Sequence, residues 1–148
     1  MDQKNFKEII QFAIEKEIGT FNVYTMCNQI AKYSGAKELF SELAKEEEAH
    51  RNILENLSME KVVQSKLDQI PDLRISDYLI EATCQPDISY AEILRVGMKN
   101  EEHSVKLYND LKDSCKDEDL KKLFAYLARE EAKHKLKIEE IYDEEILK

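Results

Sequence analysis

The feature that most constrains this chain of 148 residues is a short pattern of polar residues that occurs twice. Glu47 and His50 form a Glu-x-x-His motif, which Glu131 and His134 repeat 84 positions later. Residues three apart share one face of a helix, so each motif should project a carboxylate and an imidazole in the same direction. Another Glu precedes each motif by 30 residues, at positions 17 and 101. That distance suits a helix, a turn and half of a returning helix, which predicts a duplicated helical hairpin.

The composition agrees with amphipathic helices in a single domain spanning residues 1–148. Charged residues make up 36% of the chain and hydrophobic residues 43%, whereas Gly and Pro occur only three and two times. This mixture disfavours both disorder and a β-sandwich. The formal net charge of -9 would repel nucleic-acid phosphates and anionic lipids. We therefore expect neither a nucleic acid nor a membrane as a partner.

The N-terminus and the cysteines bear on location and on metal chemistry. Charged residues appear within the first four positions and no apolar leader follows, so we expect a cytoplasmic protein. Cys27, Cys84 and Cys115 are odd in number, widely spaced, and form no C-x-x-C pair. A disulfide framework, a zinc ribbon and a rubredoxin-type centre within this chain are therefore disfavoured.

Apolar residues spaced three and four apart predict four helices. Their expected ranges are about 2–32, 36–61, 88–115 and 117–146, with a long crossover at 62–87. Ser34 and Gly35 interrupt the first pattern and are expected to form the reversal between the first two helices. Ser89 and Glu92 have the spacing of a capping box, and Asp117 is a good N-cap for the fourth helix.

The repeat extends beyond the polar motifs into the apolar stripes. Leu39, Phe40, Leu43 and Ala44 reappear at the same offset as Leu123, Phe124, Leu127 and Ala128. Each Glu-x-x-His occupies positions where the helical period places core residues. The two halves should therefore be related by a pseudo-twofold axis, with all six polar residues facing the interior.

Four buried carboxylates would repel one another unless something neutralised them. We expect no Lys or Arg in the inner stripes near them, so two divalent cations are the simplest source of compensating charge. Mixed carboxylate and imidazole ligands favour iron, with manganese as the alternative. The predicted ligands of this dinuclear centre are Glu17, Glu47, His50, Glu101, Glu131 and His134. Glu47 and Glu131 are assigned as bridging, Glu17 and Glu101 as terminal, and each His as binding one ion.

Residues around these six carry further expectations. Tyr24 and Tyr108 each lie seven positions after a ligand Glu. Two interpretations stay open for them: core aromatics whose hydroxyls find a buried partner, or residues that hold a ligand carboxylate in place. Four further glutamates are rotated by about 100° from ligand positions and are expected to be solvated. They are Glu46, Glu48, Glu102 and Glu130.

With these residues the chain resembles the ferritin-like superfamily, and most closely its rubrerythrin-type di-iron domains. The resemblance is carried by Glu15-Lys16-Glu17 with Phe21 and Tyr24, by Glu46-Glu47-Glu48-Ala49-His50, and by the matching set ending at His134. It implies an all-α, antiparallel four-helix bundle with the long crossover between the second and third helices. It also implies that the six residues bind two iron ions, without haem, and that the activity is reduction of hydrogen peroxide.

Two departures from the resembled family shape the functional prediction. The chain has no C-x-x-C pair and hence no rubredoxin centre, so electrons would come from a separate donor such as a rubredoxin or a flavoprotein. Rubrerythrins also carry a further Glu three residues after the third-helix ligand, where this chain has Ser104. The absence of that Glu puts redox-linked ligand exchange, and with it the peroxidase activity, in question.

Several alternatives stay open on the sequence. They are a bacterioferritin-like ferroxidase and iron store, a hydroxylase of the same fold, and a non-catalytic metal-binding bundle. Either hydrogen peroxide or dioxygen would serve as the oxidant. We expect the protein to form a homodimer.

Overall fold

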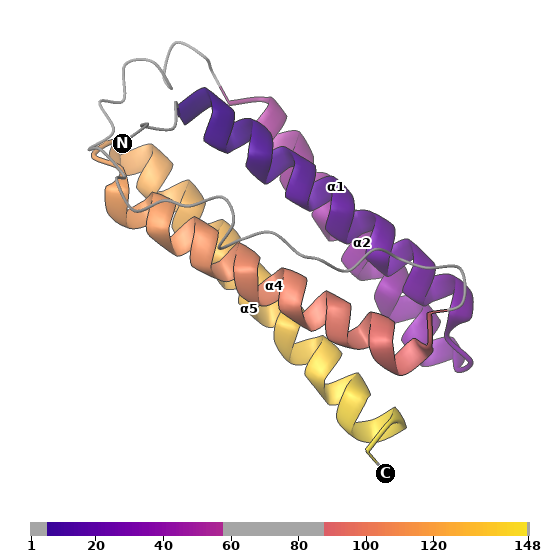
Figure 1. Cartoon of the computed structure of the whole chain (residues 1–148). Coiled ribbons are helices and arrows are strands. Elements are labelled where there is room, and N and C mark those ends of the chain that lie inside the picture. The colour runs from indigo at the N-terminus through magenta and orange to yellow at the C-terminus, as the bar shows by residue number, and fades with distance from the viewer. Residues whose placement is uncertain (1–5, 58–87, 148) are drawn as a thin grey trace.

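The computed structural model describes residues 6–57 and 88–147. Every regular element in these two ranges is an α-helix. The helices are α1 (Phe6–Ile30), α2 (Ser34–Glu55), α4 (Tyr90–Ser114) and α5 (Glu118–Glu145). The four helices run side by side along one long axis, as Figure 1 shows. The predicted all-α four-helix bundle is confirmed, while the predicted crossover at 62–87 lies entirely outside the described residues.

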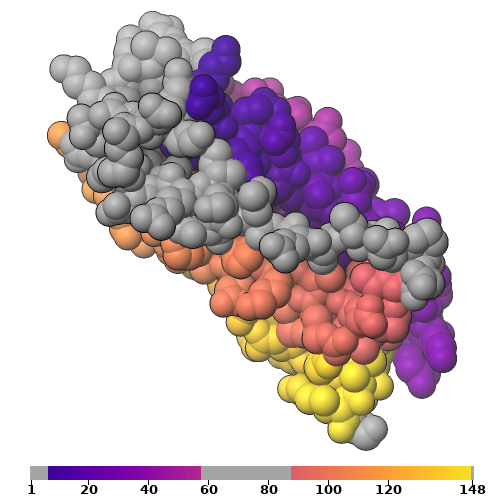
Figure 2. Space-filling view, viewed as in Figure 1, coloured from indigo at the N-terminus to yellow at the C-terminus, as the bar shows by residue number. Residues whose placement is uncertain are grey.

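The bundle consists of two hairpins. Helix α1 packs along α2, and α4 packs along α5. The hairpins join mainly through α1 and α4, whereas α2 and α5 approach each other least among the neighbouring pairs. Figure 2 views the molecule from the side on which α1 and α4 lie. The interface between α2 and α5, here called the α2–α5 seam, is thus the loosest of the four.

Local signals in the sequence set the helix starts on the C-terminal half. The Ser89 hydroxyl accepts a hydrogen bond from the Glu92 amide at 3.1 Å, as the capping box predicted. The Asp117 carboxylate accepts one from the Leu120 amide at 3.0 Å. Each cap satisfies an amide that has no partner within its own helix. These contacts place the start of α4 and of α5 within two residues of the predicted positions.

The expected reversal at Ser34 and Gly35 was wrong by a few residues. Both lie in the first turn of α2, and the non-helical connection is residues 31–33. The connection is closed by Asn28 and Lys37: the Asn28 amide donates to the Lys37 carbonyl at 2.7 Å, and the Lys37 ammonium donates to the Asn28 carbonyl at 3.0 Å. These reciprocal bonds hold the turn, and neither a positive φ nor a glycine is needed there.

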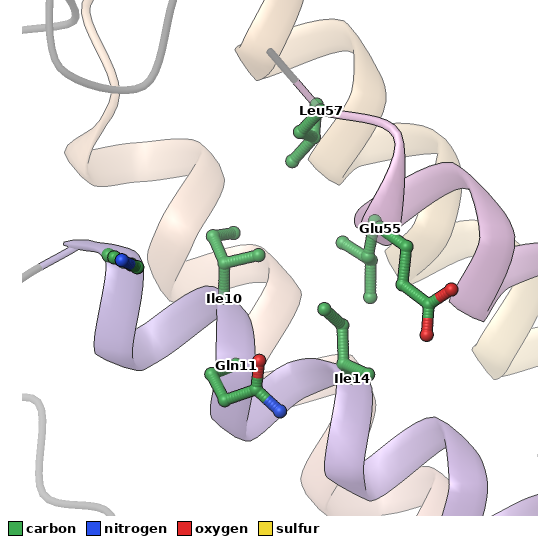
Figure 3. A pocket seen from close by; sticks show the side chains of 7 residues that line it. Ile10, Gln11, Ile14, Glu55 and Leu57 are labelled. Carbon is green, nitrogen blue, oxygen red and sulfur yellow. The ribbon is translucent and has the colours of Figure 1, made fainter. Parts of the chain in front are cut away.

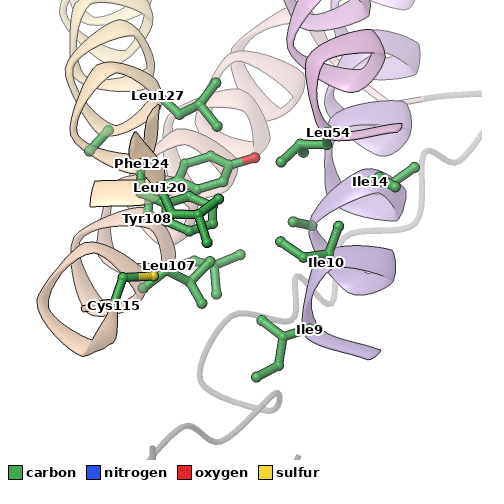
Figure 4. Packing of buried hydrophobic residues seen from close by; sticks show 13 residues of the cluster. Ile9, Ile10, Ile14, Leu54, Leu107, Tyr108, Cys115, Leu120, Phe124 and Leu127 are labelled. Carbon is green, nitrogen blue, oxygen red and sulfur yellow. The ribbon is translucent and has the colours of Figure 1, made fainter. Parts of the chain in front are cut away.

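The apolar core is divided into two clusters at opposite ends of the polar layer. The Phe124 cluster, shown in Figure 4, brings α1 and α2 against α4 and α5. Its buried members include Ile9, Leu54, Tyr108, Leu111, Phe124 and Leu127. The Phe40 cluster holds residues related to these by the repeat of 84 positions, and its buried members include Tyr24, Phe40, Leu43, Ile93, Leu94 and Ile138. Each fully buried Leu or Phe contributes roughly 1.5–3 kcal/mol, so the two clusters supply most of the stabilisation around the centre.

Candidate metal centre

The six side chains predicted as ligands meet in the middle of the bundle. Glu17 comes from α1, Glu101 from α4, and one Glu-x-x-His pair each from α2 and α5. All six are at most 2% exposed. The structure thus places together every residue of the predicted set, between the two apolar clusters.

The two halves of this cluster interlock across the α2–α5 seam. His50 Nδ1 lies 2.7 Å from an oxygen of Glu131, and His134 Nδ1 lies 2.7 Å from an oxygen of Glu47. The same nitrogens lie 3.7 Å from Glu17 and 3.8 Å from Glu101, respectively. The two imidazoles are stacked, with ring centroids 5.7 Å apart and planes 13° from parallel. Each motif therefore aims its imidazole at the carboxylate of the other hairpin.

The ligand atoms fall into two overlapping groups. Glu17, Glu47, His50 and Glu131 each offer one atom within 4.8 Å of the others, and so do Glu47, Glu101, Glu131 and His134. Glu47 and Glu131 belong to both groups, whereas Glu17 and Glu101 each belong to one. Glu47 and Glu131 are the residues expected to bridge, and Glu17 and Glu101 are those expected to bind terminally; these roles stay predictions.

Unsatisfied oxygens show that the cluster fits a pair of cations. One carboxylate oxygen on each of four residues is buried and has no hydrogen-bond partner. These atoms are Oε2 of Glu17, Glu47, Glu101 and Glu131. Buried polar atoms are nearly always satisfied, and four orphaned oxygens facing one another need positively charged partners. Hard divalent cations that take oxygen and imidazole ligands meet this requirement.

The electrostatics of the metal-free cluster also indicate a need for positively charged partners. Burial, followed by repulsion from neighbouring carboxylates, raises the pKa of Glu47 and of Glu101 well above its usual range. Burial and the charge of Glu17 raise the pKa of Glu131 to about 8. Burial alone would raise the pKa of Glu17 too, but bonds from Glu47, His50 and Tyr108 lower it overall. Without cations, protons must replace much of the missing positive charge.

Tyr24 and Tyr108 satisfy both interpretations left open by the sequence. The Tyr108 hydroxyl donates to Glu17 at 2.5 Å, and the Tyr24 hydroxyl donates to Glu101 at 2.6 Å. Each tyrosine therefore orients the glutamate of the opposite hairpin, not the one on its own helix. Their rings stack on Phe124 and Phe40, each at 6.3 Å between centroids. Core packing fixes the rings, and the hydroxyls hold two cluster carboxylates in place.

Glu46 departs from the expectation that it is solvated. Its carboxylate contacts His134 Nε2, the ring nitrogen that faces away from the cluster, and its side chain is 44% exposed. The expectation failed because Glu46 lies on the side of α2 that faces α5, which a single-helix period cannot reveal. Glu48 and Glu102 are exposed as predicted. Glu130, the equivalent of Glu46, is half-buried and pairs with Lys133 at 3.0 Å.

Lys16 is a buried cation that interacts with the cluster carboxylates, although it does not belong to the inner stripes from which Lys and Arg were expected to be absent. It immediately precedes Glu17 and is only 9% exposed. Burial lowers the pKa of Lys16, an effect opposed most strongly by the charge of Glu17 and then by the other cluster glutamates. The position lies outside the inner stripe of α1, but a long lysine stem can carry its ammonium toward a buried anion. Its equivalent in the other half is Asn100, also buried.

A separate pocket of about 230 Å³ lies between the start of α1 and the end of α2, as Figure 3 shows. It is lined by Lys7, Ile10, Gln11, Ile14, Leu54, Glu55 and Leu57. Ile14 precedes Glu17 by one helical turn, and Leu54 follows His50 by one turn, so apolar side chains lie between the pocket and the cluster. The lining offers no set of metal ligands.

Comparison with known proteins agrees with this geometry. The rubrerythrin family model matches residues 8–88 and 92–147, which is most of the chain. The chain belongs to the rubrerythrin family. Two solved structures share the fold. One is a hypothetical protein from Pyrococcus furiosus, 24% identical, with a TM-score of 0.73 over 93% of this chain and 88% of that one.

The other is described as a candidate ferritin-like diiron-carboxylate protein from Thermotoga maritima. It is 23% identical and has a TM-score of 0.71 over 95% of this chain and 96% of that one. A comparison with curated proteins found no match. Together these results confirm the resemblance predicted from the sequence and the ferritin-like bundle.

This rubrerythrin-family chain carries no rubredoxin-type cysteine pairs. Cys27 and Cys115 are buried in different clusters and form no disulfide, and Cys84 lies outside the described residues. Ser104, which follows Glu101 by one turn of α4, is 2% exposed. Among the described helices, none combines the length and the hydropathy needed to cross a bilayer.

Proposed function

We propose that this protein is a non-haem di-iron oxidoreductase that reduces hydrogen peroxide to water with electrons from a separate donor protein. The observation that carries the proposal is the pair of overlapping ligand groups, which share Glu47 and Glu131 and leave four buried oxygens unsatisfied. Membership of the rubrerythrin family supports iron as the metal. Manganese is the alternative that the same ligands would accept.

The ligand set assigns a role to each residue. Glu47 and Glu131 would bridge the two ions, Glu17 and Glu101 would bind terminally, and each His would bind one ion through Nδ1. When bound, two ferrous ions supply the two electrons that peroxide needs, according to H₂O₂ + 2e⁻ + 2H⁺ → 2H₂O. The hydroxyls of Tyr24 and Tyr108 orient the terminal carboxylates before the reaction.

The surroundings of the ligands favour small oxidants over bulky substrates. The six side chains are buried between two apolar clusters, and the pocket of Figure 3 lies one turn away behind Ile14 and Leu54. The hydroxylase alternative, which needs room for an organic substrate at the centre, gains no support from this pocket. Peroxide and dioxygen are small enough to reach such a centre.

The experiment is anaerobic loading with ferrous iron followed by parallel stopped-flow addition of peroxide and of dioxygen. We expect two ions per chain, faster oxidation by peroxide, and repeated turnover only when a reductant such as a rubredoxin or a flavoprotein is supplied. Faster reaction with dioxygen, accompanied by large assemblies and many more than two irons retained per chain, would establish the iron-storage alternative instead. A reproducible limit of fewer than two ions would exclude the dinuclear centre.

Three further expectations stay predictions. They are the identity of the electron donor, the homodimeric state and the cytoplasmic location. Light scattering coupled to size-exclusion chromatography tests the second directly. A homodimer would distinguish this protein from a cage-forming store.

A further inference from the structure

The ligands of the centre repeat between the halves, but their neighbours do not. Glu17 and His50 define one ligand group, here the Glu17/His50 position, and Glu101 and His134 define the other, the Glu101/His134 position. The shared carboxylates serve both. If the ligands alone decided affinity, the two positions would be equivalent. Any difference must come from residues that touch the ligands at equivalent places.

The first such difference concerns the outward-facing nitrogen of each imidazole. Glu46 contacts His134 Nε2, so this ring is held between the cluster on one side and a carboxylate on the other. The equivalent Glu130 pairs instead with Lys133 at 3.0 Å. The ring of Tyr126 lies edge-on to His50, with centroids 6.2 Å apart. Among the described residues, only the Glu101/His134 position therefore has a carboxylate bonded to the outer nitrogen of its histidine.

The second difference concerns the residue before each terminal glutamate. Lys16 precedes Glu17 and Asn100 precedes Glu101, and both side chains are buried. Of the four cluster carboxylates, Glu17 interacts most strongly with the charge of Lys16. A buried lysine thus adjoins the terminal glutamate of the Glu17/His50 position in the sequence, whereas a neutral amide adjoins the terminal glutamate of the other position.

Both differences favour metal binding at the Glu101/His134 position over the Glu17/His50 position. A carboxylate bonded to the outer nitrogen of a ligating histidine orients the ring and raises its basicity, and its loss typically costs 10–100-fold in metal affinity. A nearby ammonium repels a divalent cation and competes with it for the glutamate. The first effect strengthens the Glu101/His134 position, and the second weakens the Glu17/His50 position.

We propose that the two metal positions are unequal, and that a divalent cation fills the Glu101/His134 position first and the Glu17/His50 position second. Glu46 and Lys16 are the positioning residues that set this order. The inference rests on the proposed function, because it assumes that the cluster binds two ions. It adds a defined loading sequence, and it predicts that a half-loaded protein holds its ion on His134.

Two binding steps alone would not test this proposal, because repulsion between neighbouring cations separates the steps even in a symmetric centre. The test must examine each position by itself. His50→Ala leaves the Glu101/His134 position, and His134→Ala leaves the Glu17/His50 position. Each metal-free variant is titrated with cobalt(II) under nitrogen by calorimetry and visible absorption. We expect the ion bound by His50→Ala to be held at least about tenfold more tightly.

Adding Glu46→Gln to each background identifies the cause. We expect affinity to fall about tenfold in the His50→Ala background and to stay unchanged in the His134→Ala background. Glu130→Gln is the matched control and should change neither. Lys16→Gln should raise the affinity of the Glu17/His50 position in the His134→Ala background. Because Glu46 is half-exposed and Gln matches it in size, circular dichroism should show that this variant folds normally.

Three outcomes would count against these ideas, each in a different way. Equal affinities in the two single-histidine variants would overturn the unequal positions while leaving the proposed function intact. Equal effects of Glu46→Gln and Glu130→Gln would overturn the role of Glu46. Failure of the wild-type protein to bind any cobalt would instead contradict the dinuclear centre itself.

Discussion

The α1–α2 half and the α4–α5 half agree closely in the interior and differ at the edges of the centre. The six clustered residues, the two tyrosines and Phe40 with Phe124 all recur at an offset of 84 positions. Lys16 and Asn100, or Glu42 and Tyr126, occupy equivalent places without resembling each other. The buried cluster and its packing require the same residues in both halves, whereas residues at the edges of the centre can differ between the halves.

Removing a carboxylate that belongs to both ligand groups should produce the largest loss of bound metal. The loss should be the same whichever half supplies that carboxylate. We expect Glu47→Ala and Glu131→Ala each to lower metal content from two ions per chain to none, because each carboxylate belongs to both ligand groups. His50→Ala or His134→Ala should lose mainly one ion. Elemental analysis after anaerobic reconstitution measures this. A Glu47→Ala protein that kept one tightly held ion would break the equivalence of the halves.

The pH dependence of the metal-free protein should follow the three glutamates with raised pKa values. Between pH 4.5 and about 8 the folded protein keeps protons that the unfolded chain has released, so its free energy of unfolding falls as pH rises. Each such carboxyl contributes a slope of up to about 1.4 kcal/mol per pH unit. His134 opposes this below pH 6.5, because burial lowers its pKa.

Because the pKa of Glu17 is lowered, its contribution to the free energy of unfolding rises with pH, and it does so only below pH 4.5. Urea unfolding in the presence of chelator at several pH values between 5 and 8 measures the slope. The metal-loaded protein should lack it, because bound cations keep the ligands deprotonated. A metal-free protein that became more stable from pH 5 to 8 would contradict the burial argument.

Removing the hydroxyl of Tyr108 or of Tyr24 should lower stability by different amounts. This effect should be smaller than the loss of a shared carboxylate. Glu17 has a lowered pKa, so the Tyr108 hydroxyl donates to a charged carboxylate, and Tyr108→Phe should cost about 1.5–3 kcal/mol. Burial raises the pKa of Glu101 well above its usual range, which favours the neutral acid, so Tyr24→Phe should cost less, about 0.5–1.5 kcal/mol. Urea unfolding of the metal-free variants at pH 7 compares them.

Glu102→Ala is the control for this pair. Its carboxylate is exposed and lies 3.7 Å from the Lys99 ammonium, so stability should change by less than about 0.5 kcal/mol. Equal losses for the two tyrosine variants would show that the cluster carboxylates carry the same charge in both halves.

Apart from that control, the smallest predicted effect comes from a substitution that makes the two halves more alike in sequence. Gly97 is equivalent to Ala13, and a Cβ at Gly97 would meet Ile138 Cδ1 at 3.4 Å and Tyr24 Cε1 at 3.8 Å. The backbone there has no positive φ. Gly97→Ala should therefore stabilise the protein by about 0.5–1 kcal/mol, as expected for Gly to Ala within a helix. A thermal melt that showed destabilisation would indicate that Ile138 cannot shift.

Periodicity and spacing were enough to predict the four helices and the six residues that meet at the centre. They succeed because a helix determines which of its own residues share a face, and because the duplication repeats the same residue pattern in both halves. Glu46 and Lys16 were missed for one physical reason. Their roles depend on how neighbouring helices face each other and on the direction of long side chains, neither of which a single-helix pattern contains.

The α2–α5 seam has a thermodynamic consequence. Little backbone packing joins these helices, yet His50 reaches Glu131 and His134 reaches Glu47 across the gap. An ion held by both hairpins would act as a reversible cross-link at the seam with the least packing of its own. Its binding free energy would then be added to that of docking one hairpin on the other. Metal occupancy would thereby govern how tightly the bundle is closed.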